Sequence, residues 1–330
     1  MMLFHSSILF PLLPSLAVAI APPRMGDMKL VWSEEFKGDA GTSPDTKVWN
    51  IMDAINTNNE VQTYTKSNNN LQISGGGTMQ FVPRKSGKDG HWTSGRIETV
   101  DSWTPEPGKV TKIAASILIG TNSVDNKQGM WPAFWALGDA MRNGIDWPMA
   151  GEIDIFEQID GLPEAYGTVH CGNVGGGPCN EPSGRSANTA MPPDGTFNEY
   201  AVSIDRTNED WRAQTITWTV NGNSYFVLSG GEINDAPVWS SLAHSPLYLL
   251  LNVAVGGNWP GPPNDVSQQN EKSNRLETLY TILTAFIGYS RRLRQHDGGP
   301  MGRCLVDIRR ASTISQRHAH TSHDSRTKWA

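Results

Sequence analysis

The sequence predicts an all-β protein, built as a sandwich of two packed antiparallel sheets. Many short segments alternate apolar and polar residues, and Gly, Asn or Pro turns separate them. No convincing helix longer than a few turns precedes residue 265. The 33 Gly and 21 Pro among 330 residues fit a turn-rich chain, and a sandwich of this size can form one domain.

The expected strands follow one another in short succession. A first strand covers 30–36, and 71–74 and 79–83 form a hairpin around three glycines. Asn221-Gly222 is a strong turn signal between strands 215–220 and 223–228. The nearly continuous apolar run 246–255 predicts a central, buried strand. The other expected strands are 92–98, 110–119, 131–137, 151–157, 165–170 and 200–205.

Residues 151–157, Gly-Glu-Ile-Asp-Ile-Phe-Glu, combine three carboxylates with strand-forming residues. Side chains alternate along a strand, so Glu152 and Asp154 share one face. Glu157, an odd number of residues after Glu152, would point to the opposite face of a regular strand. One β-bulge between Asp154 and Glu157 resets the alternation and returns Glu157 to the face of the other two acids. The three acids then point to one place, as glycoside hydrolysis requires of a carboxyl pair with separated pKa values. The alternative interpretation is an ordinary strand with a solvated acidic face.

Three neighbouring segments decide between these interpretations. They are 129–138 (Gly-Met-Trp-Pro-Ala-Phe-Trp-Ala-Leu-Gly), 166–171 (Tyr-Gly-Thr-Val-His-Cys) and 251–261 (Leu-Asn-Val-Ala-Val-Gly-Gly-Asn-Trp-Pro-Gly). Together with 151–157 they resemble glycoside hydrolase family 16, most closely the fungal endo-β-1,3(4)-glucanases of laminarinase type. The resemblance runs from about residue 30 to about 265. It implies a concanavalin A-like β-jelly roll with a long substrate cleft across its concave sheet.

The resemblance implies a retaining mechanism with Glu152 as nucleophile, Glu157 as general acid/base and Asp154 between them. Retaining glycosidases hold the two carboxyls roughly 5–5.5 Å apart. The extra residue between Asp154 and Glu157 resembles laminarinases, so cleavage inside β-1,3 or mixed β-1,3/1,4-glucan is expected. Two alternatives are a cell-wall glucan transglycosylase that uses the same carboxylates and a non-catalytic glucan-binding protein.

Eight further residues are expected to contact the glucan. Trp131 and Trp135, four apart, share the concave face if their strand is regular, and Phe134 points the opposite way. The other six are assigned by resemblance and polarity: His170 on the leaving-group side, Asn59, Glu60 and Arg96 on the glycone side, and Asn258 and Trp259 on a loop over one end of the cleft. We expect no cofactor and no catalytic metal, because no nucleotide, nicotinamide or metal motif appears.

Residues 1–21 resemble a signal peptide, with an apolar segment from about 8 to 16. Pro11 and Pro14 interrupt that segment and argue against a membrane anchor. We therefore expect a secreted monomer, extracellular or in the cell wall, that binds β-glucan but neither nucleic acid nor membrane. In such a protein, Cys171 and Cys179 are expected to form a disulfide around a Gly-rich loop.

The predicted catalytic domain spans 22–265, and the composition changes after it. Residues 266–330 contain 11 Lys and Arg against 5 Asp and Glu, whereas residues 1–265 contain 16 against 28. Family members end in a strand of alternating acidic and aliphatic residues, which we do not identify here. Without it, the structural calcium that relatives bind partly through that strand is not supported. The tail is interpreted as a basic extension or, preferably, as an artefact of a wrong intron or reading frame.

Overall fold

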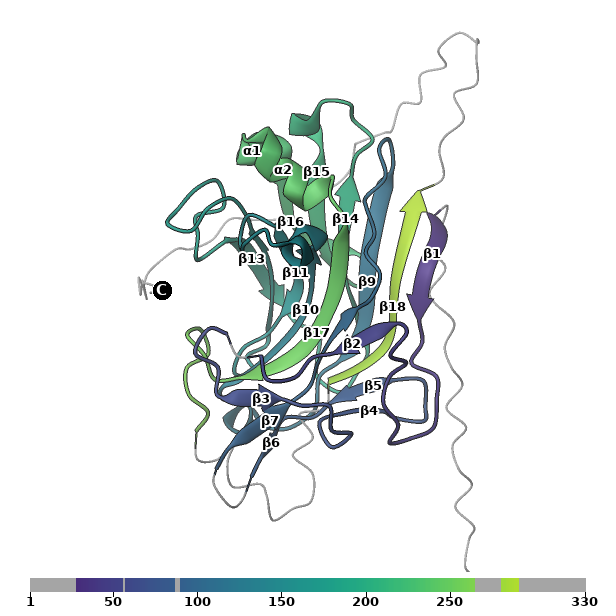
Figure 1. The fold of residues 1–330 in the computed structure, drawn as a ribbon, viewed down its shortest axis with the longest axis vertical. Coiled ribbons are helices and arrows are strands. Elements are labelled where there is room, and N and C mark those ends of the chain that lie inside the picture. Colours follow the sequence, from purple (N-terminus) through teal and green to yellow (C-terminus); the bar gives the residue numbers. More distant parts are fainter. Residues whose placement is uncertain (1–27, 56, 87–89, 265–279, 291–330) are drawn as a thin grey trace, which may run out of the picture.

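The structure is a computed structural model that describes residues 28–55, 57–86, 90–264 and the backbone of 280–290. Two large antiparallel sheets pack against each other around one core, and a small third sheet adjoins them (Figure 1). The prediction of an all-β sandwich is therefore confirmed. Among the described residues, no helix has the length and apolar character needed to cross a membrane.

The eight-stranded sheet combines strands from both ends of the described chain. Its strands, in spatial order, are β16 (Asn223–Ser229), β15 (Thr215–Val220), β14 (Asn198–Asp205), β9 (Val110–Leu118), β18 (Tyr280–Ser290), β5 (Met79–Phe81) and β4 (Leu71–Ile73), and β1 (Met28–Glu34) also pairs with β18. The predicted hairpins β4–β5 and β15–β16 are both present. Asn221 and Gly222, with φ of 48° and 79°, supply the left-handed turn of the second.

The seven-stranded sheet contains the acidic strand. Its order is β13 (Arg185–Ala190), β12 (Glu164–His170), β11 (Glu152–Glu157), β10 (Met130–Gly138), β17 (Leu247–Val255), β8 (Arg96–Thr99) and β2 (Trp49–Ile51). Strand β17 lies between β10 and β8, with most of its residues buried, as its continuous apolar run predicted. Strands β10 and β17 curve along their length (Figure 1).

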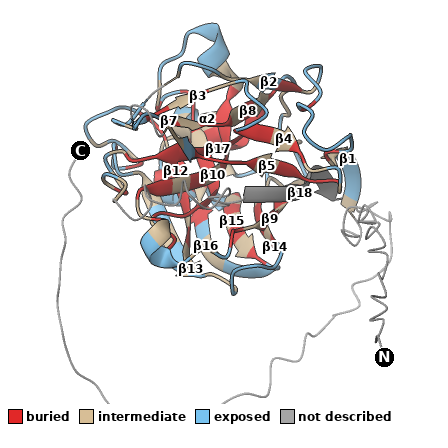
Figure 2. Ribbon diagram, turned by 90° about the horizontal axis from the view of Figure 1, so that it is seen from below, coloured by how far each residue is buried: buried red, intermediate tan, exposed pale blue. Residues whose placement is uncertain are grey.

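The remaining elements are short. The third sheet contains β3 (Gln62–Tyr64), β7 (Trp92–Ser94) and β6 (Arg84–Lys85), and its β3–β7 pair is parallel. The helices are α1 (Gly230–Ile233) and α2 (Ala236–Ala243), with 3₁₀ turns at Val124–Asn126, Asp139–Asn143 and Trp211–Ala213. Figure 2 shows the buried residues concentrated in the strands and the exposed ones in the loops.

Alternation along the strands builds the core. Ile153 and Phe156 of β11, Phe134 of β10 and Leu251 of β17 are all buried in the same apolar cluster. Tyr200 of β14 packs on Phe156 with ring centroids 4.3 Å apart, which joins the two sheets. The opposite face of the seven-stranded sheet carries polar and aromatic residues together with a smaller buried apolar cluster.

The prediction of one strand over 92–98 is wrong. The chain forms β7 and β8 instead, which belong to different sheets, and Gly95 lies between them. A Cβ at Gly95 would lie 3.0 Å from the carbonyl oxygen of Asn70 and 3.2 Å from Cβ of Leu71. A glycine is therefore needed where the chain passes from one sheet to the other.

The expectation that no closing strand follows the catalytic domain is also wrong. Strand β18 pairs with β9 along most of its length and with β5 and β1 on its other side. It therefore lies inside the eight-stranded sheet, between β9 and β5. The missing strand was the structural reason for treating the tail as an artefact, and that reason does not hold for 280–290. The expected signal peptide, and the tail at 266–279 and 291–330, lie outside the described residues.

Candidate active site

A bulge in β11 brings the three acids to one face. On β10, Trp135 pairs with Asp154 and the next residue back, Phe134, pairs with Phe156, so Ile155 is the extra residue. The register with β12 shifts between Asp154 and Glu157 as well. The predicted bulge is confirmed, and Ile155 is buried in the core on the side opposite the acids.

Each outer carboxylate accepts a hydrogen bond from a different tryptophan. Nε1 of Trp147 donates to Oε2 of Glu152 at 3.2 Å, and Nε1 of Trp131 donates to Oε1 of Glu157 at 2.9 Å. Glu157 is 7% exposed and Asp154 is 4% exposed, whereas Glu152 is partly exposed. The two outer acids thus have separate donors in a largely desolvated site, where such bonds are strong.

The central acid has the most perturbed protonation. Burial raises the pKa of Asp154 well above its ordinary value, and the charges of Glu157 and Glu152 raise it further. Burial also raises the pKa of Glu152, against the opposing effect of the positive charges of His170 and Arg96. This direction favours a protonated Asp154, and a protonated carboxyl can donate a hydrogen bond to an ionised neighbour.

His170 lies beside the acids. It is the cross-strand partner of Glu152, and its Nε2 lies 3.6 Å from Oδ2 of Asp154. Burial alone would lower the pKa of His170, but the hydrogen bond to Glu181 and the charges of Glu152 and Glu181 outweigh it and raise the pKa. His170 is therefore placed to carry a positive charge next to the acidic cluster.

Donor atoms of Glu152, Asp154 and His170 lie within 4.8 Å of one another, a spacing that a metal ion could also use. Glu152, however, stands at the motif position to which the resemblance gives the nucleophilic role, and Asp154 stands between the two reacting acids. We therefore interpret the trio as part of the acidic site and assign no metal to it.

The expected sugar contacts gather near these residues. Trp259 packs edge-on against Trp131, with centroids 5.6 Å apart, and against Tyr166 at 5.0 Å. Nδ2 of Asn59 donates to Oδ1 of Asn258 at 2.7 Å, which ties the two loops together. These contacts form an aromatic and amide group at the Glu157 end of the acidic cluster.

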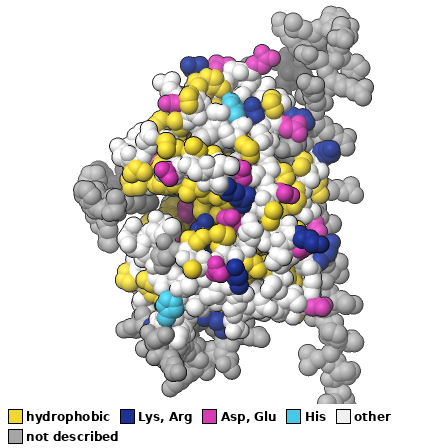
Figure 3. Space-filling view, viewed as in Figure 1, with side chains coloured by type: hydrophobic (Ala, Val, Ile, Leu, Met, Phe, Trp, Pro, Cys, Tyr) yellow, Lys and Arg dark blue, Asp and Glu magenta, His cyan; other side chains and the backbone are white. Residues whose placement is uncertain are grey.

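Trp135 and Arg96 form a second group. The Arg96 guanidinium lies 4.9 Å from the Trp135 ring centroid, and Nε1 of Trp135 donates to Oδ1 of Asn252 at 2.8 Å. Glu60 forms a backbone bridge with Gly256, and burial raises the pKa of its carboxyl. The eight sequence-predicted contact residues thus lie on β8, β10 and β12 or on the two loops that Asn59 and Asn258 join. Figure 3 shows the surface hollowed at mid-height, where hydrophobic and charged side chains meet.

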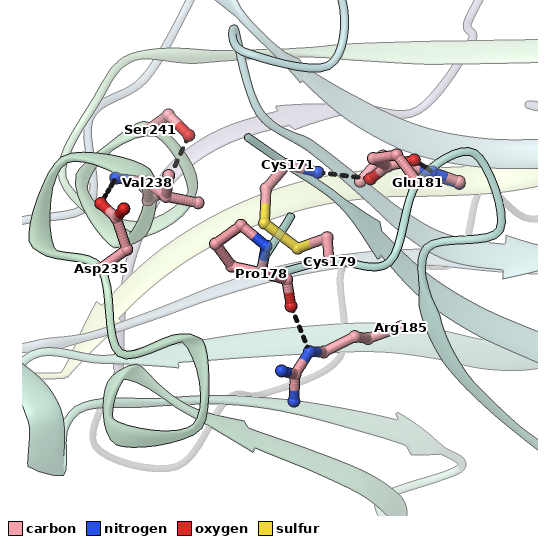
Figure 4. Close-up of a disulfide and its surroundings, with 9 residues drawn as sticks. Cys171, Pro178, Cys179, Glu181, Arg185, Asp235, Val238 and Ser241 are labelled. Atoms are coloured by element: carbon pink, nitrogen blue, oxygen red, sulfur yellow. Dashed lines mark hydrogen bonds and ion pairs between the residues drawn. A yellow bond between two sulfur atoms is a disulfide. The ribbon is translucent and has the colours of Figure 1, made fainter. Parts of the chain in front are cut away.

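Sequence reasoning missed three residues of this site. Trp147 precedes the acidic strand by five residues, and a tryptophan in that polar turn was the available signal. Asn252 lies within the 251–261 motif, but its contact is distant in sequence, since its Nδ2 donates to the Tyr64 hydroxyl at 3.1 Å. Glu181, which bonds His170, stands in a turn segment whose pattern gave no signal. The predicted disulfide between Cys171 and Cys179 is present (Figure 4).

Comparison with known proteins agrees with the geometry. The XgeA-like catalytic domain of glycoside hydrolase family 16 matches residues 51–220. The chain belongs to glycoside hydrolase family 16. A β-glucanase from Rhodothermus marinus is 30% identical over 71% of this chain and 77% of its own length.

Two further relatives of this family 16 chain differ in length. A glucan endo-1,3-β-glucosidase A1 from Niallia circulans is 30% identical over 72% of this chain, which covers only 35% of that protein. The crystal structure of an endo-1,3-β-glucanase from Streptomyces sioyaensis is similar at a TM-score of 0.74 and 30% identity, over 82% of this chain and 99% of that one. The chain thus spans about a third of some curated relatives and nearly all of this structural one.

Proposed function

We propose that the chain is an endo-β-glucanase that hydrolyses internal β-1,3 and mixed β-1,3/1,4-glucosidic bonds with retention of configuration. The observation that carries this proposal is the bulged strand β11, which directs Glu152, Asp154 and Glu157 to one face beside two tryptophans. The named activities of the Niallia, Rhodothermus and Streptomyces relatives support the choice of β-glucan.

The chemistry divides between the two outer acids. Glu152, ionised, attacks the anomeric carbon and forms a glycosyl-enzyme intermediate, while Glu157 donates its proton to the leaving oxygen. Glu157 then removes a proton from water, and the hydroxide displaces Glu152 with a second inversion. The raised pKa of Asp154, caused by burial and by the charges of Glu157 and Glu152, supports a role in which Asp154 keeps its proton and donates it in a hydrogen bond to ionised Glu152.

The aromatic residues support a polymeric substrate. Trp131 and Trp259 lie at the Glu157 end of the acidic cluster and Trp135 pairs with Asp154. Indole rings on both sides of the reacting bond offer apolar platforms for glucose units, as an enzyme that cuts within a chain requires. The partly exposed rings of Trp131 and Trp135 remain available for such stacking.

Incubation of the purified chain with laminarin tests the proposal. Hydrolysis raises the number of reducing ends, transglycosylation conserves it while chain lengths change, and binding alone changes neither. NMR of the first product formed should show the β-anomer, as retention requires. An unchanged reducing-end count over many enzyme equivalents would refute the proposal, and an α-anomer would refute the retaining mechanism.

We also propose that the protein acts outside the cell as a monomer. The Cys171–Cys179 disulfide supports this location, because disulfides persist in oxidising compartments. Fractionation of the source cells, followed by size-exclusion chromatography of the active fraction, tests both parts. Activity confined to the cytosol, or elution as a dimer, would contradict them.

A further inference from the structure

His170 lies between two sets of carboxylates. Its Nδ1 lies 2.8 Å from Oε2 of Glu181, and its Nε2 faces Oδ2 of Asp154 at 3.6 Å. An ionised carboxylate can only accept a hydrogen bond, so Nδ1 must carry the proton that Glu181 accepts. Protonation of Nε2 then produces an imidazolium ion directly beside the acids of β11.

Glu181 is held more firmly than an ordinary loop glutamate. Its side chain is 0% exposed, and its second oxygen, Oε1, accepts from the backbone N–H of Cys171 at 2.7 Å. Its backbone pairs with Gly176 in both directions, at 2.7 Å and 3.0 Å. The disulfide joins Cys171 to Cys179, and Glu181 follows two residues after the loop that it closes (Figure 4).

The imidazole ring has little freedom to turn away. The Trp147 ring packs on it with centroids 5.3 Å apart, at an interplanar angle of 44°. On another side, a Cβ added at Gly184 would lie 2.8 Å from Cε1 of His170, so the glycine backbone approaches the ring closely. The Trp147 ring and the Gly184 backbone therefore restrain the plane of the His170 ring, while Glu181 determines which ring nitrogen faces the acids.

We propose that Glu181 is a positioning residue that holds His170 in place as the positively charged neighbour of Glu152 and Asp154. The inference rests on the proposed glucanase function for its role in catalysis, but the arrangement itself can be tested without turnover. The disulfide loop acquires a purpose from it, because its Cys171 and Gly176 hold the buried Glu181 carboxylate, two residues beyond the loop, where it acts on the reacting acids through one imidazole.

The charges around His170 explain why such a residue is needed. The charges of Glu152 and Glu157 act on it from β11 and that of Glu181 from the segment after the disulfide loop, Asp154 lies 3.6 Å away, and Arg96 of β8 also acts on Glu152. The nucleophile must be ionised in this buried acidic site, and an imidazolium ion favours its ionised form. Without the Glu181 carboxylate, burial would favour neutral His170 and remove that support.

The test is Glu181→Gln, measured first by NMR titration of the His170 imidazole, with His170→Asn to assign the resonance. Removing the carboxylate should lower the pKa of His170 by about one unit, the effect expected for one charge-assisted hydrogen bond. At pH values above the His170 pKa of the mutant, kcat on laminarin should then be about tenfold lower in the mutant than in wild type. This difference should disappear as the pH is lowered below that pKa. KM should change little.

Two further variants complete the design. Glu181→Asp keeps the charge and should hold the pKa of His170 closer to the wild-type value than Glu181→Gln does. Glu199→Gln removes a comparably paired carboxylate from the other sheet, where Glu199 binds Lys112 at 2.6 Å, and should leave both His170 and kcat unchanged.

Three results would overturn the inference: an unchanged His170 titration in Glu181→Gln, a mutant to wild-type kcat ratio that is constant with pH, or equal effects of Glu181→Asp and Glu181→Gln. A purely structural role predicts a constant kcat ratio, together with a lower Tm.

If Glu181→Gln does not fold, the His170 titrations of Glu181→Asp and wild type still give the comparison. A wild-type chain inactive on laminarin would refute the proposed function, while the His170 titration would still decide the role of Glu181.

Discussion

The hydrogen bond from Trp147 to Glu152 leads to a prediction about pH dependence. In Trp147→Phe an aromatic ring remains, but the Nε1–H that donates to Oε2 of Glu152 at 3.2 Å is lost. That bond favours the ionised carboxylate and opposes the effect of burial, which raises the pKa of Glu152. Without the bond the pKa of Glu152 rises further, so the acidic limb of kcat/KM moves to higher pH.

The magnitude follows from the type of bond. A hydrogen bond to a charged group contributes about 1.5–3 kcal/mol, and a bond of 3.2 Å in a partly exposed site belongs at the lower end. About 1.5 kcal/mol corresponds to roughly one pH unit. Below the acidic limb the variant should therefore be about tenfold slower than wild type, and on the plateau, where Glu152 is ionised in both, the difference should be much smaller.

The assay is kcat/KM on laminarin across the acid and neutral range, which reports ionisations of the free enzyme. Trp211→Phe is the matched control, because Trp211 packs on the core beside α1 and its ring contacts Arg212. This control should keep the wild-type acidic limb. If Trp147→Phe instead reduces kcat/KM equally at every pH, the bond to Glu152 does not influence its ionisation and the reasoning is wrong.

Three further predictions follow. Glu152→Gln should keep glucan binding and Tm but lose essentially all turnover, because an amide cannot attack; residual activity above a few per cent would contradict its role as nucleophile. Glu157→Ala should be rescued by azide on a substrate with a good leaving group and should give a β-glycosyl azide, whereas an α-azide or no rescue would contradict the retaining mechanism. A chain ending at residue 279 should aggregate and one ending at 290 should fold, since β18 pairs with β9, β5 and β1; equal Tm values would show that β18 is dispensable.

Some of the fold could be read from local pattern because local physics determines it. The parity argument at Glu152, Asp154 and Glu157 required a bulge, since a regular strand would have buried the Glu157 carboxylate in the apolar core. The hairpin at Asn221-Gly222 followed from the need for two left-handed residues in a two-residue turn. Such features depend on a few neighbouring residues and therefore appear in the sequence.

Strand β18 shows where this approach fails. Residues 280–290 read Tyr-Thr-Ile-Leu-Thr-Ala-Phe-Ile-Gly-Tyr-Ser, an apolar segment without strict alternation, which periodicity alone does not distinguish from a helix. A strand hydrogen-bonded on both sides is specified by the strands that receive it, here β9, β5 and β1. Its place in the sheet thus depends on pairing partners that precede it by about 160 to 260 positions, which no local window contains.

The candidate site divides in the same way. The acids and the tryptophans on β10 were predictable because alternation assigns them a face, but the groups that set their protonation come from elsewhere in the chain. Trp147 arrives from the turn before β11, and Glu181 from the segment just after the loop closed by Cys171 and Cys179. A strand can present three carboxylates on one face, yet alternation does not distinguish the role of Glu152 from that of Glu157. The separate donors, and the imidazole that lies nearer Glu152 and Asp154, supply the asymmetry that a nucleophile and an acid/base require.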